Sequence, residues 1–260
     1  MKAVILCGGK GTRIRDVSED KPKPMVPIGS RPILWHIMKY YSHWGYDDFV
    51  ICLGYKGYVI KDFFLNYDFL TRDFIITLGQ TNKISFLNGE NEMKWRVTLA
   101  ETGLEAGTGA RVFRCQKYLT GEQDFMLTYG DGIGDINLHE LVSFHRSHGK
   151  ILTVTGVKPP GRFGELMSDQ NGRVTEFNEK PQATGGMISG GFFVCRREIF
   201  QYLDDRENLT LEMEPMANLV KEGQLMVYEH NGFWHPMDTY RDYLLLNNLF
   251  DKGNAPWKVW

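Results

Sequence analysis

The sequence contains few cysteines, and none has the paired spacing of a zinc site or a redox dithiol. Its 260 residues include four cysteines. They are Cys7, Cys52, Cys115 and Cys195. Three of them end or lie inside apolar, strand-like runs, so we expect reduced, buried thiols. This cysteine usage excludes a disulfide-stabilised secreted domain.

Long apolar runs and a strong net charge are also missing. No apolar run approaches the roughly 20 residues needed to span a bilayer, and the strand-like run at Ala3 leaves no room for a signal peptide. The net charge is −2, with 42% hydrophobic and 24% charged residues, which is ordinary for a globular protein. We therefore expect a cytoplasmic protein that binds neither membranes nor nucleic acid.

What the chain does contain is an alternation of strand-like and helix-like segments, as in α/β proteins with a largely parallel sheet. The expected strands are 3–7, 48–53, two or three between 74 and 100, 124–129, 151–157, 162–168, 173–177, 187–195 and 225–229. The expected helices are 33–44, 57–66, 110–119, 138–148, 197–204, 211–222 and one starting near Thr239.

These segments predict a Rossmann-like fold with a mixed, mostly parallel central sheet, flanking helices and a smaller antiparallel β lobe. The length fits a single domain, residues 1–260. The pattern of the sequence changes near residue 158, where short predicted strands separated by Gly, Asn and Pro begin. We expect a nucleotide-binding half at 1–157 and a second half at 158–260.

The most informative segment is a glycine-rich loop directly after the first strand. Gly8, Gly9 and Gly11 permit positive φ angles, so consecutive backbone N–H groups can converge on an oxyanion such as phosphate. The loop lacks the Gly-Lys-Ser/Thr series of a P-loop, and Ile14 stands where a dinucleotide fingerprint needs its third glycine. A turn that is glycine-rich for steric reasons alone is the structural alternative.

Basic residues follow this loop closely. Five basic and three acidic residues lie between Lys10 and Lys23, although the whole chain is slightly acidic. Arg13 offers a planar fork that binds phosphate through two hydrogen bonds, and Lys23 supplies a compact charge. In the run 21–24 each lysine precedes a proline, which biases its backbone toward extended conformations. We interpret Lys21 as solvated and Lys23 as the functional lysine.

Asp131 is the candidate metal ligand. It follows the apolar strand 124–129 and lies between two glycines, at the carboxyl edge where open α/β sheets bind ligands. One carboxylate with phosphate oxygens and waters is a typical Mg²⁺ arrangement. Asp135 is better explained as a helix cap. Asp238 is either a residue near the last helix N-terminus or a second metal ligand, and no histidine spacing indicates a zinc helix or a catalytic triad.

The sequence resembles the sugar-1-phosphate nucleotidyltransferases. That family opens with a strand and Gly-Gly-x-Gly-Thr-Arg, followed about ten residues on by Pro-Lys-Pro-Met/Leu-x-Pro-Ile, and residues 8–13 and 22–28 resemble both motifs. The resemblance to the cytidylyltransferases within the family extends along almost the whole chain. It includes residues 32–38, 54–61, 128–132, 159–164, 179–181, 190–194 and 232–239.

This resemblance implies a reaction between CTP and α-D-glucose 1-phosphate, with Mg²⁺, in a homo-oligomer that is hexameric in such relatives. The implied catalytic residues are Arg13, Lys23 and Asp131. The implied nucleotide-binding residues are Leu6, Cys7, Gly8, Gly9, Lys10, Gly11, Thr12, Arg13, Lys23, Arg111 and Gly130. The implied sugar-phosphate residues are Tyr129, Glu179, Lys180 and Gly191, and the implied metal ligands are Asp131 and Asp238.

The chain departs from the family at two instructive points. Cys7 stands where an alanine is common, and the stretch 102–110 lacks the Gln-x-x-Pro-x-Gly element that thymidylyl and uridylyl relatives use near the base. The second departure favours cytosine over thymine. The same reaction with UTP, dTTP or another sugar 1-phosphate remains the alternative, and a non-catalytic nucleotide-binding module is a third reading.

Overall fold

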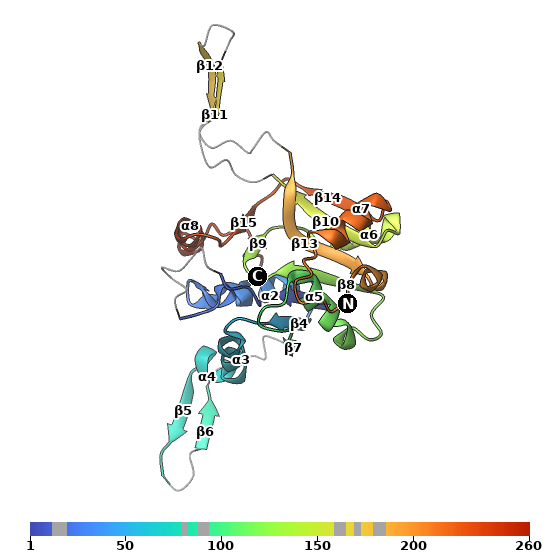
Figure 1. The fold of residues 1–260 in the computed structure, drawn as a ribbon. Coiled ribbons are helices and arrows are strands. Elements are labelled where there is room, and N and C mark those ends of the chain that lie inside the picture. Colours follow the sequence, from blue (N-terminus) through green and yellow to red (C-terminus); the bar gives the residue numbers. More distant parts are fainter. Residues whose placement is uncertain (12–19, 80–82, 88–93, 159–164, 169–172, 179–185) are drawn as a thin grey trace.

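The fold is built on one central sheet of seven strands in the order β14-β10-β13-β8-β1-β4-β7 (Figure 1). The computed structural model describes residues 1–11, 20–79, 83–87, 94–158, 165–168, 173–178 and 186–260. The strands are β1 (Ala3–Leu6), β4 (Asp48–Leu53), β7 (Arg96–Glu101), β8 (Asp124–Tyr129), β10 (Leu152–Val157), β13 (Ile188–Arg196) and β14 (Leu225–His230).

Most neighbouring strands run parallel, which confirms the predicted sheet. β1 pairs with β4 and β8, β4 pairs with β7, and β10 pairs with β14, all in parallel. Only β13 is antiparallel to its neighbours β8 and β10 within this sheet. We expected residues 187–195 among the short ribbons of the second half. Instead, β13 lies in the middle of the sheet, where its residues Phe192, Phe193, Val194 and Cys195 are buried.

Helices cover both faces of the sheet, so the strands read as nearly continuous apolar runs. Alternate residues of β1 enter different cores: Ala3 and Ile5 join one buried cluster, and Val4 joins the other. The first cluster includes residues of α2 (Ile33–His43), α3 (Gly57–Leu65), α6 (Leu138–His148) and α8 (Tyr240–Asp251). The second includes residues of α5 (Thr108–Arg114), the 3-10 turn η3 (Arg197–Tyr202) and α7 (Glu214–Lys221).

The helix ends follow local chemistry in the sequence. The Asn137 side chain accepts a hydrogen bond from the Glu140 N–H at the start of α6, and Gly149 ends this helix in the left-handed conformation. Thr239 caps α8 and forms a capping box with Asp242. The predicted helices at 33–44, 57–66 and 138–148 and the helix starting near Thr239 are confirmed within one or two residues.

Three helix predictions differ from the structure. The helix expected at 110–119 starts earlier, at Thr108, and ends at Arg114, where the 3-10 turn η2 (Gln116–Tyr118) takes over. Residues 197–202 form η3 instead of an α-helix. The helix expected from residue 211 starts at Glu214, because Pro215 fits the first helical turn.

Several small elements border the sheet. Lys23–Met25 forms a 3-10 turn, η1, followed by the pair β2 (Pro27–Ile28) and β3 (Arg31–Pro32). β9 (Gly132–Gly134) pairs with β15 (Trp234–Pro236). The antiparallel ribbons are β5 (Phe74–Thr77) with β6 (Lys83–Phe86), and β11 (Glu165–Ser168) with β12 (Val174–Asn178). Both ribbons project from the body in Figure 1, and α4 (Tyr67–Thr71) leads into the first.

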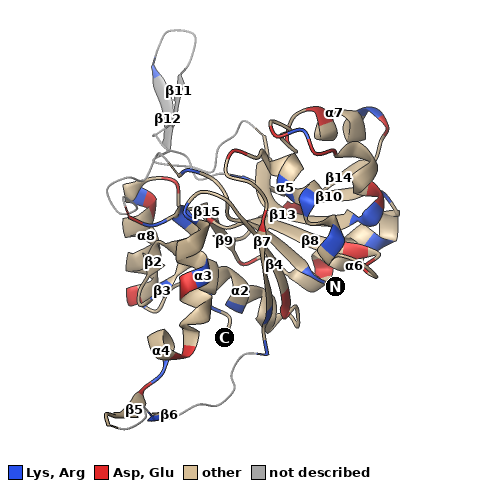
Figure 2. Ribbon diagram, turned by 60° about the horizontal axis from the view of Figure 1, so that its bottom comes forward, with Lys and Arg blue, Asp and Glu red and all other residues tan. Residues whose placement is uncertain are grey.

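One expectation from composition is confirmed. All four cysteines are free and buried. Within the described ranges, no helix has the length and apolar character required to cross a membrane. Charges of both signs are interspersed over the helices in Figure 2, as the net charge of −2 suggests.

Gly191 in β13 generates a stability prediction. Its φ is +75°, and a Cβ there would lie 2.4 Å from a ring carbon of Tyr129. Gly223 has a similar φ of +63° but open space around its Cβ position. We expect Gly191→Ala to lower the free energy of unfolding by about 2–3 kcal/mol and Gly223→Ala by only about 1 kcal/mol, since both bear the backbone strain and only the first must displace the ring. Urea unfolding measures the free energy of unfolding of both variants. Equal losses would contradict the expected clash between the new Cβ and the Tyr129 ring.

Candidate active site

The candidate site lies at the carboxyl ends of β1 and β8, which are parallel neighbours. Such ends meet at one edge of a sheet, and open α/β sheets bind ligands there. An open pocket of about 840 Å³ occupies this edge. It is lined by Leu6, Cys7, Gly8, Gly9, Gly11, Lys23, Pro24, Ala106, Gly107, Thr108, Arg111, Tyr129, Gly130, Asp131 and Thr210. Ten of these fifteen residues were named from the sequence.

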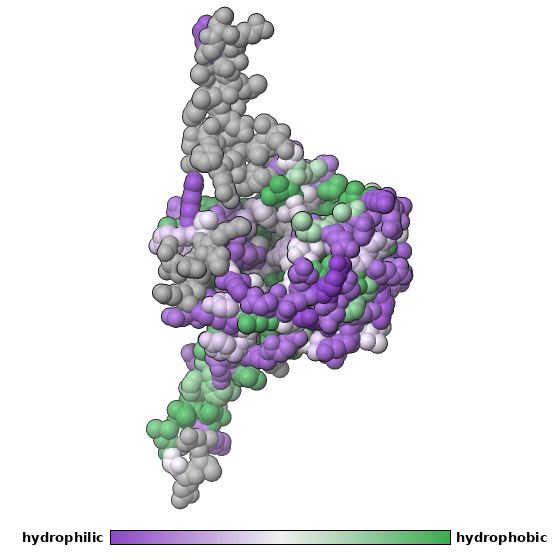
Figure 3. Space-filling model, viewed as in Figure 1, coloured by the Kyte–Doolittle hydropathy of each residue, from purple (hydrophilic) through white to green (hydrophobic). Residues whose placement is uncertain are grey.

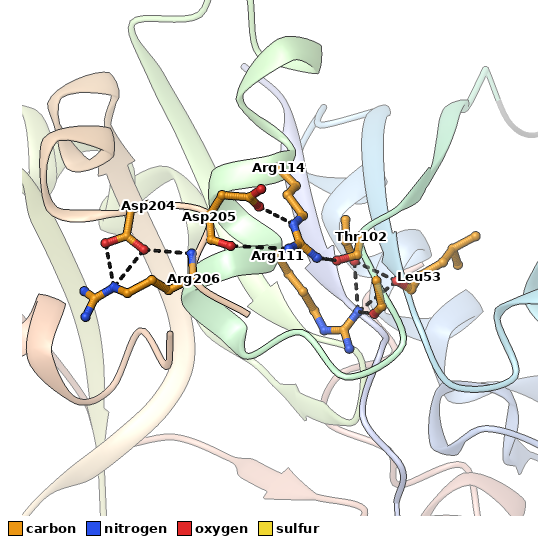
Figure 4. Close-up of polar contacts among 8 residues, drawn as sticks. Leu53, Thr102, Arg111, Arg114, Asp204, Asp205 and Arg206 are labelled. Carbon is orange, nitrogen blue, oxygen red and sulfur yellow. Dashed lines mark hydrogen bonds and ion pairs between the residues drawn. The ribbon is translucent and has the colours of Figure 1, made fainter. Parts of the chain in front are cut away.

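Arg111, on α5, holds the loops around this pocket together. Its buried guanidinium donates to the carbonyl oxygens of Leu53 (2.8 Å), Gly103 (2.7 Å), Gly8 (3.1 Å) and Leu104 (3.2 Å) and to the Thr102 hydroxyl (2.9 Å). Figure 4 shows it beside Leu53 and Thr102. Burial lowers the pKa of Arg111 from its usual value. The acceptors belong to the glycine loop and to the ends of β4 and β7, so one side chain ties three strand ends together.

The glycine loop is built differently from the sequence-based expectation. Of its three glycines only Gly11 has a positive φ, +58°. Position 8 has no room for a side chain, because a Cβ there would lie 2.1 Å from the Arg111 guanidinium carbon. The Gly8 carbonyl also accepts from the Tyr55 N–H at 3.2 Å. The loop is therefore positioned by Arg111 and Tyr55, and its glycines serve close approach as much as backbone freedom.

At one end of the pocket, a lysine lies between two aspartates from distant parts of the chain. The Lys23 Nζ is 3.0 Å from an Asp131 carboxylate oxygen and forms a second, short ion pair with Asp238. Asp131 follows β8, and the Pro236–Gly132 pairing of β15 with β9 brings Asp238 beside it. The Met237 N–H donates to the Asp131 carbonyl at 2.7 Å. Asp238 thus faces Lys23, while the N-cap role next to it belongs to Thr239.

The electrostatics of this trio depend on burial and on the mutual charges. Burial by itself lowers the pKa of Lys23, but Asp131 and Asp238 outweigh it, so the Lys23 pKa lies above its usual value. Burial raises the pKa of Asp131, and the Lys23 charge only partly opposes this. The Asp131 and Asp238 carboxylates thus converge on one ammonium group.

The donor set fits a hard divalent cation. Within the described ranges no group of three or more His, Cys, Asp and Glu side chains is placed to hold a metal ion. Asp131 and Asp238 form a pair of oxygen donors that already converge on a positive group, the Lys23 ammonium. Mg²⁺ commonly uses one or two carboxylates and fills its remaining positions with phosphate oxygens and waters.

The other sequence-predicted residues have varied positions. Lys10 is half exposed and pairs with Glu105 at 2.8 Å. Gly191 lies against the Tyr129 ring instead of lining the pocket. Thr12, Arg13, Glu179 and Lys180 lie outside the described residues.

Sequence reasoning missed the side of the pocket formed by α5 and the segment before α7. Ala106, Gly107, Thr108 and Thr210 line the pocket, and Glu212 holds two of the hydroxyl groups beside it. These residues carry no motif of their own. For Ala106, Gly107 and Thr108 the signal was the stretch 102–110, which was read only for the glutamine element that it lacks.

Comparison with known proteins identifies the family of this chain. Residues 2–252 match the model of the family described as nucleotidyl transferase. The glucose-1-phosphate cytidylyltransferase of Salmonella typhi is 47% identical over 260 residues, which cover the whole of both chains. The probable glucose-1-phosphate cytidylyltransferase of Bacillus subtilis is 44% identical, again over the whole of both chains.

Solved structures share the fold at lower identity. HddC from Yersinia pseudotuberculosis superposes with a TM-score of 0.67 at 22% identity, over 96% of this chain and 99% of that chain. A putative glucose-1-phosphate thymidylyltransferase from Bacillus anthracis gives a TM-score of 0.64 at 19% identity, over 96% of this chain and 94% of that chain. With its glycine loop, its lysine between two aspartates and a family match over almost its full length, this chain belongs to the nucleotidyl transferase family of enzymes.

Proposed function

We propose that this enzyme transfers the cytidylyl group of CTP to α-D-glucose 1-phosphate and releases CDP-glucose and pyrophosphate. The full-length identity of 44–47% to relatives named for that activity supports the two substrates. One structural observation carries the reaction class: the glycine loop and the Lys23–Asp131–Asp238 cluster line or border one pocket. Such a pocket suits a nucleoside triphosphate with a metal ion.

Asp131 and Asp238 would hold Mg²⁺. The bound ion would supply charge neutralisation for the triphosphate, as it does in phosphoryl-transfer enzymes generally. Lys23 remains fully charged near neutral pH, since its pKa is raised by the same two carboxylates that outweigh its burial. Its ammonium is therefore available to the phosphates.

The protein residues in this reaction act by binding and by charge, without a general base. A phosphate monoester has a second pKa of about 6, so the sugar phosphate is already an oxygen nucleophile at neutral pH. The nucleophile would attack the α-phosphorus in line, and pyrophosphate would leave on the opposite side. Lys23, together with Arg13, would stabilise the charge that develops on the pyrophosphate. The N–H groups of residues 8–11 would contact the triphosphate.

The sugar phosphate would bind on the side of the second half of the chain. By resemblance, its binding residues are Tyr129, Glu179, Lys180 and Gly191. We propose residues 1–157 as the nucleotide-binding half and 158–260 as the sugar-binding half. We also propose that the reaction takes place in the cytoplasm. The same chemistry with UTP or dTTP, or with another sugar 1-phosphate, is the alternative that the relatives' names disfavour.

A substrate matrix tests this function. Purified protein with Mg²⁺ is mixed with CTP, UTP, dTTP or ATP and with several sugar 1-phosphates, and pyrophosphate release is followed. We expect rapid release only with CTP and glucose 1-phosphate. Comparable turnover with another nucleotide and sugar 1-phosphate would contradict the proposed substrates. Nucleotide binding without any pyrophosphate release would indicate a binding module.

We further propose that the enzyme is a homo-oligomer, a hexamer by resemblance to the cytidylyltransferases. The arm formed by α4, β5, β6 and the adjoining loops carries many exposed apolar side chains, and it is largely green in Figure 3. They are Leu65, Phe69, Leu70, Phe74, Ile75, Ile76, Leu78, Ile84 and Leu87, with exposed fractions of 38–79%. An apolar surface of this extent commonly marks a protein interface.

Comparison with Lys21 separates the specific role of Lys23 from the general effect of losing one positive charge. We expect Lys23→Ala to lower kcat at least about a hundredfold, because losing one charge-stabilising donor costs roughly 3–4 kcal/mol of barrier. The exposed Lys21, two residues away, is the control, and Lys21→Ala should remain near wild type. Thermal unfolding checks that both variants are folded. A folded Lys23→Ala enzyme with near-normal turnover would remove Lys23 from the reaction.

The arm can be tested by charge insertion. Leu78→Asp combined with Ile75→Asp should reduce the assembly from a mass near six times the 30.0 kDa chain to a smaller species, because buried carboxylates oppose association. Val220→Asp on α7, where the side chain is 62% exposed, is the matched control and should leave the mass unchanged. Light scattering coupled to size-exclusion chromatography gives the masses. An unchanged mass in the arm variant would exclude the arm as an interface.

A further inference from the structure

Asp242, in the first turn of α8, reaches back beyond the start of the helix to Asp238. One of its carboxylate oxygens accepts hydrogen bonds from the Thr239 N–H at 2.8 Å and from the Thr239 hydroxyl at 2.9 Å. The same oxygen accepts from the Asp238 N–H at 3.1 Å. A capping box uses only the N–H of the N-cap residue, which is Thr239. The contact with Asp238 is therefore additional to the cap.

The second carboxylate oxygen of Asp242 binds the strand that precedes Asp238. It accepts a hydrogen bond from the His235 Nε2 at 3.0 Å. His235 is buried in β15, where it pairs with Ile133 of β9, and its ring stacks against Phe233. Asp242 thus contacts the chain before and after the turn between β15 and α8, and this turn carries Asp238.

The helix α8 is itself attached to the segment that follows η1. The Asn247 side chain accepts a hydrogen bond from the Gly29 N–H at 2.9 Å and donates one to the Pro27 carbonyl at 3.4 Å. Figure 2 shows α8 beside β2, which contains Pro27. One helix therefore contacts both the segment that follows Lys23 and the turn that carries Asp238.

These contacts support the turn of Asp238 from two sides. On the side of the sheet, the Met237 N–H donates to the Asp131 carbonyl at 2.7 Å. On the side of the helix, Asp242 binds the Asp238 N–H. Both carboxylate oxygens of Asp242 accept from protein donors, and Asp242 is absent from the described residues that line the pocket. An effect of Asp242 on a ligand would therefore act through Asp238.

The position of Asp238 matters because Mg²⁺ demands nearly ideal octahedral geometry. Two carboxylates from distant parts of the chain can serve such an ion only if both are held in place. Residues that hold metal ligands through hydrogen bonds commonly change the metal affinity by about 10–100-fold when they are replaced. Asp242 is placed to have such an effect.

We propose that Asp242 is a positioning residue for the metal site, which holds the Asp238 carboxylate beside Asp131 and Lys23 by binding the Asp238 N–H and bracing the turn between β15 and α8. This inference rests on the metal site of the proposed function. A residue that only capped α8 would contribute to the stability of the fold and leave the metal affinity unchanged. The two roles therefore predict different results.

Mn²⁺ binding to the full-length protein with CTP, in the absence of sugar phosphate, measures metal affinity separately from turnover. Free Mn²⁺ is followed by its EPR signal, and a titration of CTP alone corrects for metal that the nucleotide binds in solution. We expect Asp242→Ala to raise the Mn²⁺ dissociation constant at least about tenfold. Asp242→Asn should stay within about threefold of wild type, because its amide keeps an acceptor for the Asp238 N–H and offers a donor to His235.

Two cap variants are the matched controls. Thr239→Ala removes the capping hydroxyl of α8 and leaves the Asp238 N–H beside Asp242. Glu140→Ala removes the acidic residue at the equivalent position of α6, which is not among the described residues that line the pocket. Both should leave the Mn²⁺ dissociation constant within about threefold of wild type, although the loss of a cap lowers stability. If Asp242→Ala weakens Mn²⁺ binding no more than these variants do, the inference is wrong.

A double variant tests whether Asp242 acts through Asp238. In a protein that carries Asp238→Ala, the further change Asp242→Ala should not weaken Mn²⁺ binding again, because the carboxylate that Asp242 positions is already absent. Losses of affinity that simply add in the double variant would show that Asp242 acts elsewhere, and they would overturn the inference.

Failure of the inference can be told apart from failure of the proposed function. If the wild-type protein binds no Mn²⁺ with any nucleoside triphosphate, the proposed metal site is wrong. A crystal structure of the Asp242→Ala variant then decides the inference, which predicts that Asp238 moves away from Lys23. An unchanged turn between β15 and α8, with the Lys23–Asp238 ion pair retained, would overturn it.

Discussion

The contact of one ammonium group with two carboxylates organises this site. Lys23 is 108 residues from Asp131 and 215 residues from Asp238 in the sequence. The trio forms because β8 ends beside β1, because η1 follows the glycine loop, and because β15 pairs with β9. Without its lysine, this end of the pocket would hold two repelling carboxylates in a partly buried place. The two carboxylates are donors of the kind that a divalent cation uses, and the ammonium group can bind a polyanionic ligand.

A second constraint preserves the shape of the pocket. Arg111 satisfies carbonyl groups at the ends of three strands without any carboxylate partner among the described residues. The arginine-centred and the lysine-centred networks thus both shape the wall of one pocket.

The sequence predicted the sheet and the location of the site because both depend on local signals. Apolar runs ending in glycine indicated β1, β4 and β8, and the apolar run at 151–157 indicated β10. The contact of Lys23 with Asp238 was not predictable, since it depends on the three-residue strands β9 and β15, whose pairing has no sequence signature. Glu212 was missed because its role depends on partners 83 and 104 residues away.

The central proposal is that Asp131 and Asp238 hold a metal ion in the working enzyme, at the place where the Lys23 ammonium lies. A crystal structure of the enzyme with CTP and Mn²⁺, located by its anomalous scattering, tests this most directly. The account predicts a metal bound by the Asp131 and Asp238 carboxylates, with the Lys23 Nζ moved onto the phosphates. A metal bound elsewhere, with Lys23 still between the two aspartates, would contradict it.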